Sequence, residues 1–211
     1  VVMNIIIKNK EEIEILREGG KRLATILATV ARSVKPGVSA YDLDVLAEEL
    51  IRDGGDEPAF KGYKPSHHSK PFPATLCVSV NGEVVHGIPH KDKMLKEGDI
   101  VSIDLGIKHK GLFTDHAITV PVGKISKVDQ DLLTITNEAL LAGINAIGIG
   151  TKVGDVGSTI ASYAKKAKYG IIRELAGHGV GKYIHEDPFI PNYGVARKGA
   201  TFVPGMVVAI E

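Results

Sequence analysis

The sequence predicts an α+β fold made of two similar α/β halves, and three observations lead to this prediction. Near the N-terminus, two amphipathic segments with helical spacing are followed by short apolar runs that are typical of strands. A second pair of amphipathic segments occurs later in the chain and is again followed by apolar runs. Between the two pairs lies a predicted β-hairpin with an aspartate in each arm, so the strands also carry the candidate chemistry.

The first half begins with a predicted helix over residues 10–34, where apolar side chains recur at helical spacing. Ser39 is the predicted N-cap of a second helix, with Asp42 three residues later, and the Gly54-Gly55 pair ends that helix. Strands are then predicted over residues 75–80, 83–87, 99–107 and 112–120. These elements define a first half of about residues 10–122.

The second half repeats this plan. Its helices are predicted from the cap residue Ser126 to a break at Gly150, and over residues 154–168. Adding 113 to a residue number maps Leu27 to Leu140, Gly37 to Gly150 and Asp42 to Asp155. Two unrelated helix pairs can match by chance, but the shared break glycine and aspartate favour a duplicated half over residues 126–211. Strands are predicted over residues 171–173 and 205–211, so the last strands of the second half are expected to be missing.

Asp104 and Asp115 lie in the two arms of the predicted hairpin. A turn at His109-Lys110 would place them directly opposite each other, with Cβ atoms about 4.5–5.5 Å apart. A turn at Lys110-Gly111 would shift the pairing by two residues and keep both on one face. A single mid-strand aspartate is commonly just solvated, but two on one face of an apolar hairpin repel each other unless a proton or a cation lies between them. The pair therefore predicts a metal site.

The composition is that of an ordinary globular chain and argues against several classes of function. The 211 residues include 44% hydrophobic and 24% charged residues, and the net charge is +1. This balance does not favour binding to nucleic acid or to a membrane surface, and no apolar run is long enough to span a bilayer. The single Cys77 excludes an internal disulfide and, without a predicted signal peptide, favours the cytoplasm.

Three histidines and a glutamate are candidate partners of the aspartate pair, although a lone histidine in a loop is usually structural or solvated. His86 lies in a predicted loop, and His178 lies between two glycines that free its imidazole to project. His185 follows seven residues later, and Glu211 ends an apolar run in which a buried carboxylate needs a partner. Two aspartates, a glutamate and one histidine suit Mn²⁺, Fe²⁺ or Co²⁺, with Mg²⁺ and Zn²⁺ as alternatives, and the carboxylates can bridge two ions.

A set of ordered motifs runs along essentially the whole chain. The motifs are Cys77-Val-Ser-Val-Asn81, Val85-His86-Gly-Ile-Pro89, Gly98-Asp-Ile-Val-Ser-Ile-Asp104, Asp115, Gly177-His178-Gly-Val-Gly181, His185-Glu-Asp-Pro188 and Pro204-Gly-Met-Val-Val-Ala-Ile-Glu211. Together they resemble the type I methionine aminopeptidases. The resemblance implies the pita-bread (creatinase/aminopeptidase) fold, with two pseudo-symmetric halves around a curved antiparallel sheet. It also implies that residues 3–211 form a single catalytic domain, incomplete at the C-terminus.

The resemblance assigns roles to the matching positions. Asp104, Asp115, His178 and Glu211 match four of the five metal-binding side chains, which hold two divalent ions. Glu211 would also shuttle a proton during hydrolysis. The resemblance further implies that His86 contacts the peptide beside the scissile bond and that His185 stabilises the developing oxyanion.

The implied reaction is removal of the initiator methionine from nascent proteins with a small second residue. Cys77, Tyr63 and Phe60 would line a mainly apolar pocket for the methionine side chain. The partner is the N-terminal peptide of a nascent protein near the ribosome exit region, and a monomer is expected for the full-length protein.

Two departures from the family pattern keep alternatives open. The fifth ligand, a second glutamate from a strand after residue 211, is absent, so a truncated chain with weakened dinuclear binding is expected. The segment 64–71 looks like an insertion beside the substrate pocket, and its His67-His68 pair is expected to lie in an exposed loop. The alternatives are an inactive fragment or non-catalytic binding module on this scaffold, and a proline-directed peptidase of the same fold.

Overall fold

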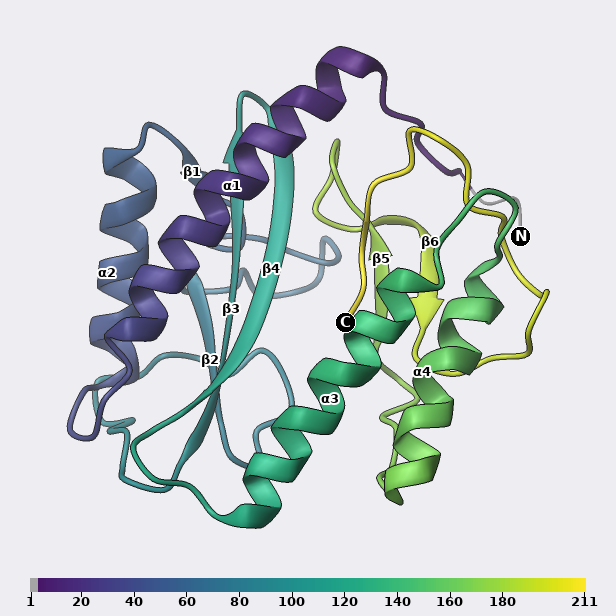
Figure 1. Cartoon of the computed structure of the whole chain (residues 1–211). Coiled ribbons are helices and arrows are strands. Elements are labelled where there is room, and N and C mark those ends of the chain that lie inside the picture. Colours follow the sequence, from purple (N-terminus) through teal and green to yellow (C-terminus); the bar gives the residue numbers. More distant parts are fainter. Residues whose placement is uncertain (1–3) are drawn as a thin grey trace. The chain divides into compact units, whose positions relative to one another are not determined.

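The computed structural model describes residues 4–211, which form two compact units (Figure 1). One unit is Glu14–Lys127, and the other combines residues 4–13 with Val128–Glu211. Residue 3, at which the predicted domain begins, lies outside the described residues. The helices are α1 (Lys10–Arg32), α2 (Ala40–Asp53), α3 (Lys127–Asn145) and α4 (Val153–Ala167). The strands are β1 (Glu57–Pro58), β2 (Leu76–Val80), β3 (Ile100–His109), β4 (Leu112–Pro121), β5 (Ala176–Gly179), β6 (Glu186–Pro191) and β7 (Val208–Ala209).

In the unit Glu14–Lys127, β3 is the central strand of an antiparallel sheet. One edge of β3 pairs with β4 along its whole length, and the other edge pairs with β2 and then with β1. Successive side chains of a strand point to opposite faces. The apolar residues 101, 103, 105 and 107 of β3 therefore share one face, and Ser102, Asp104 and Gly106 share the other.

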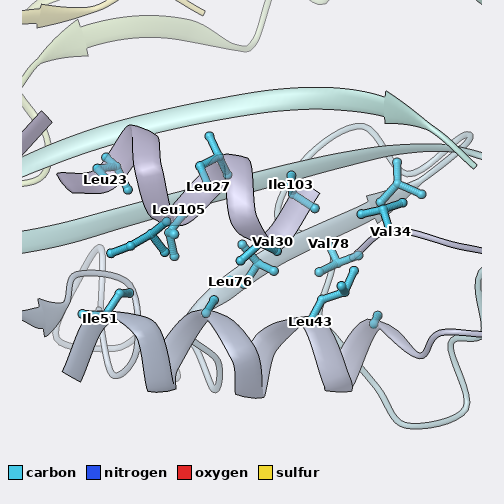
Figure 2. Packing of buried hydrophobic residues seen from close by; sticks show 14 of the residues in the cluster. Leu23, Leu27, Val30, Val34, Leu43, Ile51, Leu76, Val78, Ile103 and Leu105 are labelled. Carbon is cyan, nitrogen blue, oxygen red and sulfur yellow. The ribbon is translucent and has the colours of Figure 1, made fainter. Parts of the chain in front are cut away.

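The apolar face of this sheet packs against α1 and α2 (Figure 2). Side chains from both helices and from β2 and β3 interlock there, each at most 1% exposed: Leu23, Leu27, Val30, Leu43, Ile51, Leu76, Val78, Ile103 and Leu105. Burying an aliphatic side chain of this size contributes about 1.5–3 kcal/mol to stability. The helices thus fix the sheet from one side and leave its other face to the polar residues.

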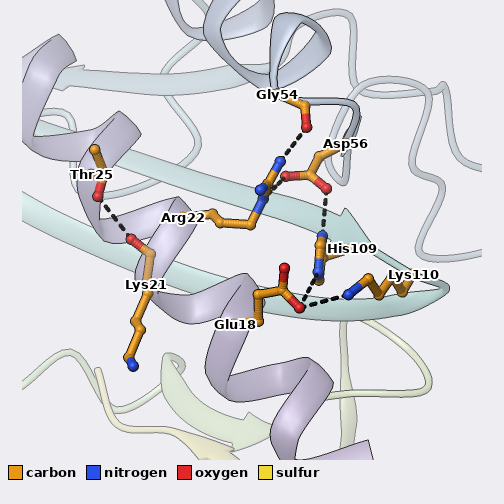
Figure 3. A network of polar contacts seen from close by, with 8 residues as sticks. All are labelled: Glu18, Lys21, Arg22, Thr25, Gly54, Asp56, His109 and Lys110. Carbon is orange, nitrogen blue, oxygen red and sulfur yellow. Dashed lines mark hydrogen bonds and ion pairs between the residues drawn. The ribbon is translucent and has the colours of Figure 1, made fainter.

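A polar network joins α1, the segment after α2 and the end of β3 (Figure 3). The Nδ1 atom of the buried His109 lies 2.6 Å from Oδ1 of Asp56, and its Nε2 lies 3.3 Å from the Glu18 carboxylate. Arg22 Nε donates to the other oxygen of Asp56 at 2.7 Å, and its guanidinium also donates to the Gly54 carbonyl. The network ties the turn end of the hairpin to both helices.

The second unit contains the antiparallel sheet β6-β5-β7, and α4 packs on it with α3 beside it. Their core includes Ala139, Val153, Val156, Ile160, Ile190 and Phe202. Two glycines bring α4 against the chain that follows β6. A Cβ atom on Gly154 would lie 2.2 Å from the Val195 carbonyl oxygen, and one on Gly157 would lie 2.4 Å from that of Tyr193. Larger residues at these two positions would push the helix off the segment.

The predicted helices are confirmed, with ends that differ by a few residues. Ser39 is the N-cap of α2, and its side chain accepts a hydrogen bond from the backbone N–H of Asp42 at 3.1 Å. At the start of α4, Asp155 accepts one from the backbone N–H of Lys152 at 2.8 Å. The left-handed backbone of Lys168, with φ 62°, ends α4.

The two units share a hydrogen-bond pattern around the start of their second helices. In one unit, Leu95 N donates to Val38 O at 2.9 Å and Ala40 N donates to Lys93 O at 2.8 Å. The matching bonds in the other unit run from Phe202 N to Thr151 O at 2.8 Å and from Val153 N to Ala200 O at 2.9 Å. The residues at the start of the second helix, Val38 and Thr151, are 113 positions apart. The residues that bond to them, Leu95 and Phe202, are only 107 apart, because the chain between helix and bonding partner is shorter in the second copy. An offset of 107 maps Asp104 onto Glu211.

Two predicted strands are wrong. Residues 83–87 form a loop, because the backbone of His86 turns through a positive φ of 56° that breaks an extended conformation. Residues 171–173 also form a loop. Their β-branched side chains gave a strand signal, but the nearby strand β5 already pairs with β6 on one edge and β7 on the other.

Candidate metal centre and peptide-binding face

The hairpin β3–β4 places Asp104 and Asp115 on one face of the sheet. Asp104 pairs with Ala117, and Asp115 pairs with Gly106, so the turn is Lys110-Gly111 and the two aspartates are diagonal neighbours. Of the two predicted registers, the shifted one is therefore correct. Diagonal neighbours on an antiparallel pair are about 7–8 Å apart, a separation across which carboxylates can approach a shared cation.

Cys77 lies directly across from Asp104 on the neighbouring strand β2. The thiol is buried, with 4% of the residue exposed. Burial raises the pKa of Cys77, and the negative charges of Asp104 and Asp115 raise it further. The thiol therefore stays protonated at neutral pH and presents an apolar surface beside the two carboxylates.

The ring of Phe60 covers the middle of this face. A Cβ atom on Gly106 would lie 2.7 Å from Cε1 of Phe60, so only glycine leaves room for the ring there. Tyr63 lies in the adjoining turn, where its backbone N–H donates to the Phe60 carbonyl at 2.9 Å and its own carbonyl accepts from Phe72 at 2.9 Å. Partial burial raises the pKa of Tyr63. An apolar ring, a thiol and two carboxylates thus share one side of the sheet.

The exposed His86 is held beside β2 by its neighbour Gly87. The Gly87 carbonyl accepts from Val78 N at 2.8 Å, and the Gly87 N–H donates to Ser79 Oγ at 3.0 Å. A Cβ atom on Gly87 would lie 2.2 Å from the Val78 carbonyl oxygen, so this close approach requires glycine. The loop therefore presents His86 next to the strand that carries Cys77.

In the other unit, His178 on β5 faces Glu211. His178 is buried, and its Nδ1 lies 2.9 Å from the carbonyl oxygen of Gly179, which can only accept. Nδ1 therefore carries the proton in the neutral ring, and Nε2 presents its lone pair. Nε2 lies 3.1 Å from Oε1 of Glu211. A lone pair and a carboxylate oxygen at this distance repel each other unless a proton or a cation lies between them. The two atoms are therefore a donor pair that fits a divalent metal.

His185 stands against His178. Their ring centroids are 4.4 Å apart, and the rings are inclined at 64°. The seven-residue spacing thus brings both imidazoles together from opposite ends of the loop that joins β5 to β6. The structure groups Phe60, Cys77, Asp104 and Asp115 in one unit, and His178, His185 and Glu211 in the other.

Two residues that contact the loop around His185 were missed by sequence reasoning. Lys8 and Glu186 form an ion pair of 2.5 Å, and each side chain is 1% exposed. Glu186 had a signal, since it lies inside the motif that begins at His185. Lys8 had none, because it is 178 residues away in the sequence and belongs to no motif.

Residues 14–211 match the pattern of metallopeptidase family M24. The chain belongs to this family, and its predicted α+β class and pita-bread fold are confirmed. No helix within residues 4–211 is both long and apolar enough to cross a bilayer.

Within the family, the chain is similar to proteins named methionine aminopeptidase. It is 43% identical over 207 residues to that of Clostridium acetobutylicum, covering 98% of this chain and 80% of that protein. It is 44% identical over 211 residues to that of Aquifex aeolicus, covering 99% and 82%. The crystal structure of methionine aminopeptidase from Thermotoga maritima superposes with a TM-score of 0.93 at 41% identity, covering 98% and 80%. Prolidase from Pyrococcus furiosus superposes with a TM-score of 0.83 at 26% identity, covering 97% and 56%.

Proposed function

We propose that this chain is a metal-dependent aminopeptidase that hydrolyses the peptide bond after an N-terminal methionine. The observation that carries the proposal is its 43–44% identity, over nearly its whole length, to proteins named methionine aminopeptidase. Similarity to prolidase is lower, at 26% identity, so a proline-directed peptidase is less well supported. A non-catalytic module is also less well supported, because the chain keeps the carboxylates and histidines of the candidate site.

The proposed metal ligands are Asp104, Asp115, His178 and Glu211. The hairpin register supports the first two, because it keeps both carboxylates on one face. The tautomer of His178 supports the other two, because it directs an Nε2 lone pair toward the glutamate. This oxygen-rich set with one imidazole favours two ions of Mn²⁺, Fe²⁺ or Co²⁺, with Mg²⁺ and Zn²⁺ as alternatives. Bound ions of this kind lower the pKa of water and polarise the scissile carbonyl.

The side chains of the chain itself would move protons and hold the peptide. Glu211 would take a proton from the attacking water and deliver it to the amine that leaves as the C–N bond breaks. His185 would donate a hydrogen bond to the carbonyl oxygen as negative charge develops on it. His86 would contact the peptide beside the scissile bond.

Phe60, Tyr63 and Cys77 would form the pocket for the methionine side chain. The ring of Phe60 and the protonated thiol of Cys77 give this face an apolar surface, and a thioether packs favourably against an aromatic ring. The substrates would be N-terminal peptides of nascent proteins with a small second residue, met near the ribosome exit region in the cytoplasm. The full-length protein is expected to be a monomer.

A peptidase assay tests the proposal. The purified protein is stripped with a chelator and reloaded with Mn²⁺, Fe²⁺ or Co²⁺. Release of methionine from Met-Ala-Ser is expected, with little release from a peptide whose second residue is large. Absence of Met-Ala-Ser cleavage at every metal concentration would refute the proposal, and preferential cleavage of Ala-Pro would support the proline-directed alternative.

A further inference from the structure

We propose that Lys8 and Glu186 are a positioning pair that fixes His185 for hydrolysis, an inference that rests on the proposed function. The pair joins the segment before α1 to the first residue of β6, directly after His185. Both belong to the same compact unit. Neither residue touches the peptide in this proposal, and both act through the backbone that carries His185.

The ion pair is short, buried and supported by further hydrogen bonds. Lys8 Nζ lies 2.5 Å from Glu186 Oε2 and also donates to the Ile6 carbonyl at 3.1 Å. The second carboxylate oxygen of Glu186 accepts from the backbone N–H of Tyr183 at 2.9 Å. A buried ion pair adds little to stability compared with apolar side chains of similar volume, because both charges lose their hydration. Its distinctive contribution is therefore a defined geometry.

That geometry closes the turn around His185. Glu186 reaches back to Tyr183 N, so its carboxylate brackets residues 184 and 185. Glu186 is also the β6 partner of Gly179, the residue after His178, and the ladder changes register at this point. A Cβ atom on Gly179 would lie 3.1 Å from that of Glu186, which shows how closely the two strands approach. With the turn fixed at both ends, the His185 ring is held 4.4 Å from that of His178.

The segment that supplies Lys8 is itself anchored. The backbone N–H of Lys8 donates to the Gly205 carbonyl at 2.8 Å, and a Cβ atom on Gly205 would lie 2.7 Å from Cγ2 of Ile7. Asn4 N donates to the Asp187 carboxylate at 2.8 Å, and Ile5 forms a β-bridge to the same residue. The ammonium group therefore enters from an anchored segment rather than from a flexible tail.

The test compares kcat and KM of Lys8→Met with those of the unmodified enzyme on Met-Ala-Ser. A slight displacement of a reacting group can cost about 100-fold in rate, so we expect kcat to fall about 10- to 100-fold while KM changes little. The apolar double variant Lys8→Met/Glu186→Met should keep the melting temperature and still lose kcat. Lys182→Met is the matched control, since Lys182 lies in the same loop but forms a more exposed ion pair with Glu12 of α1, and it should retain full activity.

A double-mutant cycle separates positioning from a general structural role. If the pair acts through His185, Lys8→Met should cause no further loss of kcat in a His185→Ala background. An equal fold-loss in both backgrounds would overturn the inference. Two-dimensional NMR of the histidine rings gives a readout that does not need activity, because Lys8→Met should shift or broaden the His185 signals. Unchanged signals would also overturn the inference, whatever the outcome for the peptidase function.

Discussion

At the scale of single residues, Gly106 decides what can lie on the acidic face of β3. Its missing side chain makes room for the Phe60 ring next to Asp104. We expect Gly106→Ala to displace the ring and to raise KM for Met-Ala-Ser about tenfold or more, the usual effect of a lost apolar contact in a pocket. Gly82→Ala is the control, because no atom lies within 4 Å of its new Cβ. Steady-state kinetics of both variants measure the effect, and an unchanged KM in Gly106→Ala would contradict the proposed role of Phe60.

Asp155 gives a prediction about pH. Backbone N–H groups of Lys152 and Arg197 donate to its carboxylate and hold the pKa of Asp155 below its ordinary value. The ionised form is thus favoured in the folded state, so this stabilisation is present above the unfolded pKa of about 4 and is lost as pH falls through the lowered folded value. Thermal melts should show Asp155→Asn less stable than the unmodified chain at neutral pH, with a smaller difference at acid pH. Glu49→Gln, at an exposed carboxylate in α2, should show no such trend.

At the scale of elements, the adjacent glycines of α1 separate helix propensity from packing. A Cβ atom on Gly20 meets no atom within 4 Å, whereas one on Gly19 would lie 3.2 Å from the Cβ of His109. Because alanine is favoured over glycine in a helix by about 1 kcal/mol, Gly20→Ala should raise the free energy of unfolding by about that amount. Gly19→Ala should gain less or lose stability, because α1 must move away from β3. Denaturant unfolding of the two variants checks this, and equal gains would mean that α1 does not pack closely there.

The network of Figure 3 should contribute to the docking of α1 and β3. Asp56 accepts from both Arg22 and His109, and its side chain is 2% exposed. Asp56→Ala would leave a buried imidazole and a partly buried guanidinium without this partner, so we expect a loss of about 3 kcal/mol in urea unfolding. Glu18→Gln alters the exposed end of the same network and should cost clearly less stability than Asp56→Ala. Similar losses for both variants would contradict the difference in burial.

The elements that could be predicted were those whose signal is local and periodic. Strands β3 and β4 were predictable because apolar stretches flank a polar, glycine-containing turn, and this pattern also placed Asp104 and Asp115 in the two arms. The exact register was not predictable, because either turn kept both aspartates on one face. The pair of Lys8 and Glu186 left no pattern, since two single residues far apart in the sequence create no period.

At the scale of the whole molecule, the repeat was predictable only in its helices. The offset of 113 holds for the residues that begin the second helix of each unit, and then falls to 107 on the segments that face them. A shorter connection in one copy removes the constant spacing that sequence comparison depends on. An offset of 107 maps Asp104 onto Glu211, so the repeat predicts a carboxylate at the matching point of each unit.

The division of the proposed metal ligands between the two units gives a prediction for the whole chain. The proposed ligands Asp104 and Asp115 belong to one unit, and His178 and Glu211 belong to the other, so a metal that binds all four should stabilise both units together. Saturating Mn²⁺ at 100 times its dissociation constant would add about 2.7 kcal/mol to the free energy of unfolding. Calorimetry of the chelator-treated and reloaded protein measures this gain.

Variants and hydrogen exchange make that test specific. Asp104→Asn should lose most of the metal-dependent gain, and Ser102→Ala, on the same face of β3, should keep it. Hydrogen exchange should show added protection in β3, β4 and β5 when metal is present. Protection confined to one unit would mean that the metal is held by the ligands of that unit alone, and the four-ligand centre would then be wrong.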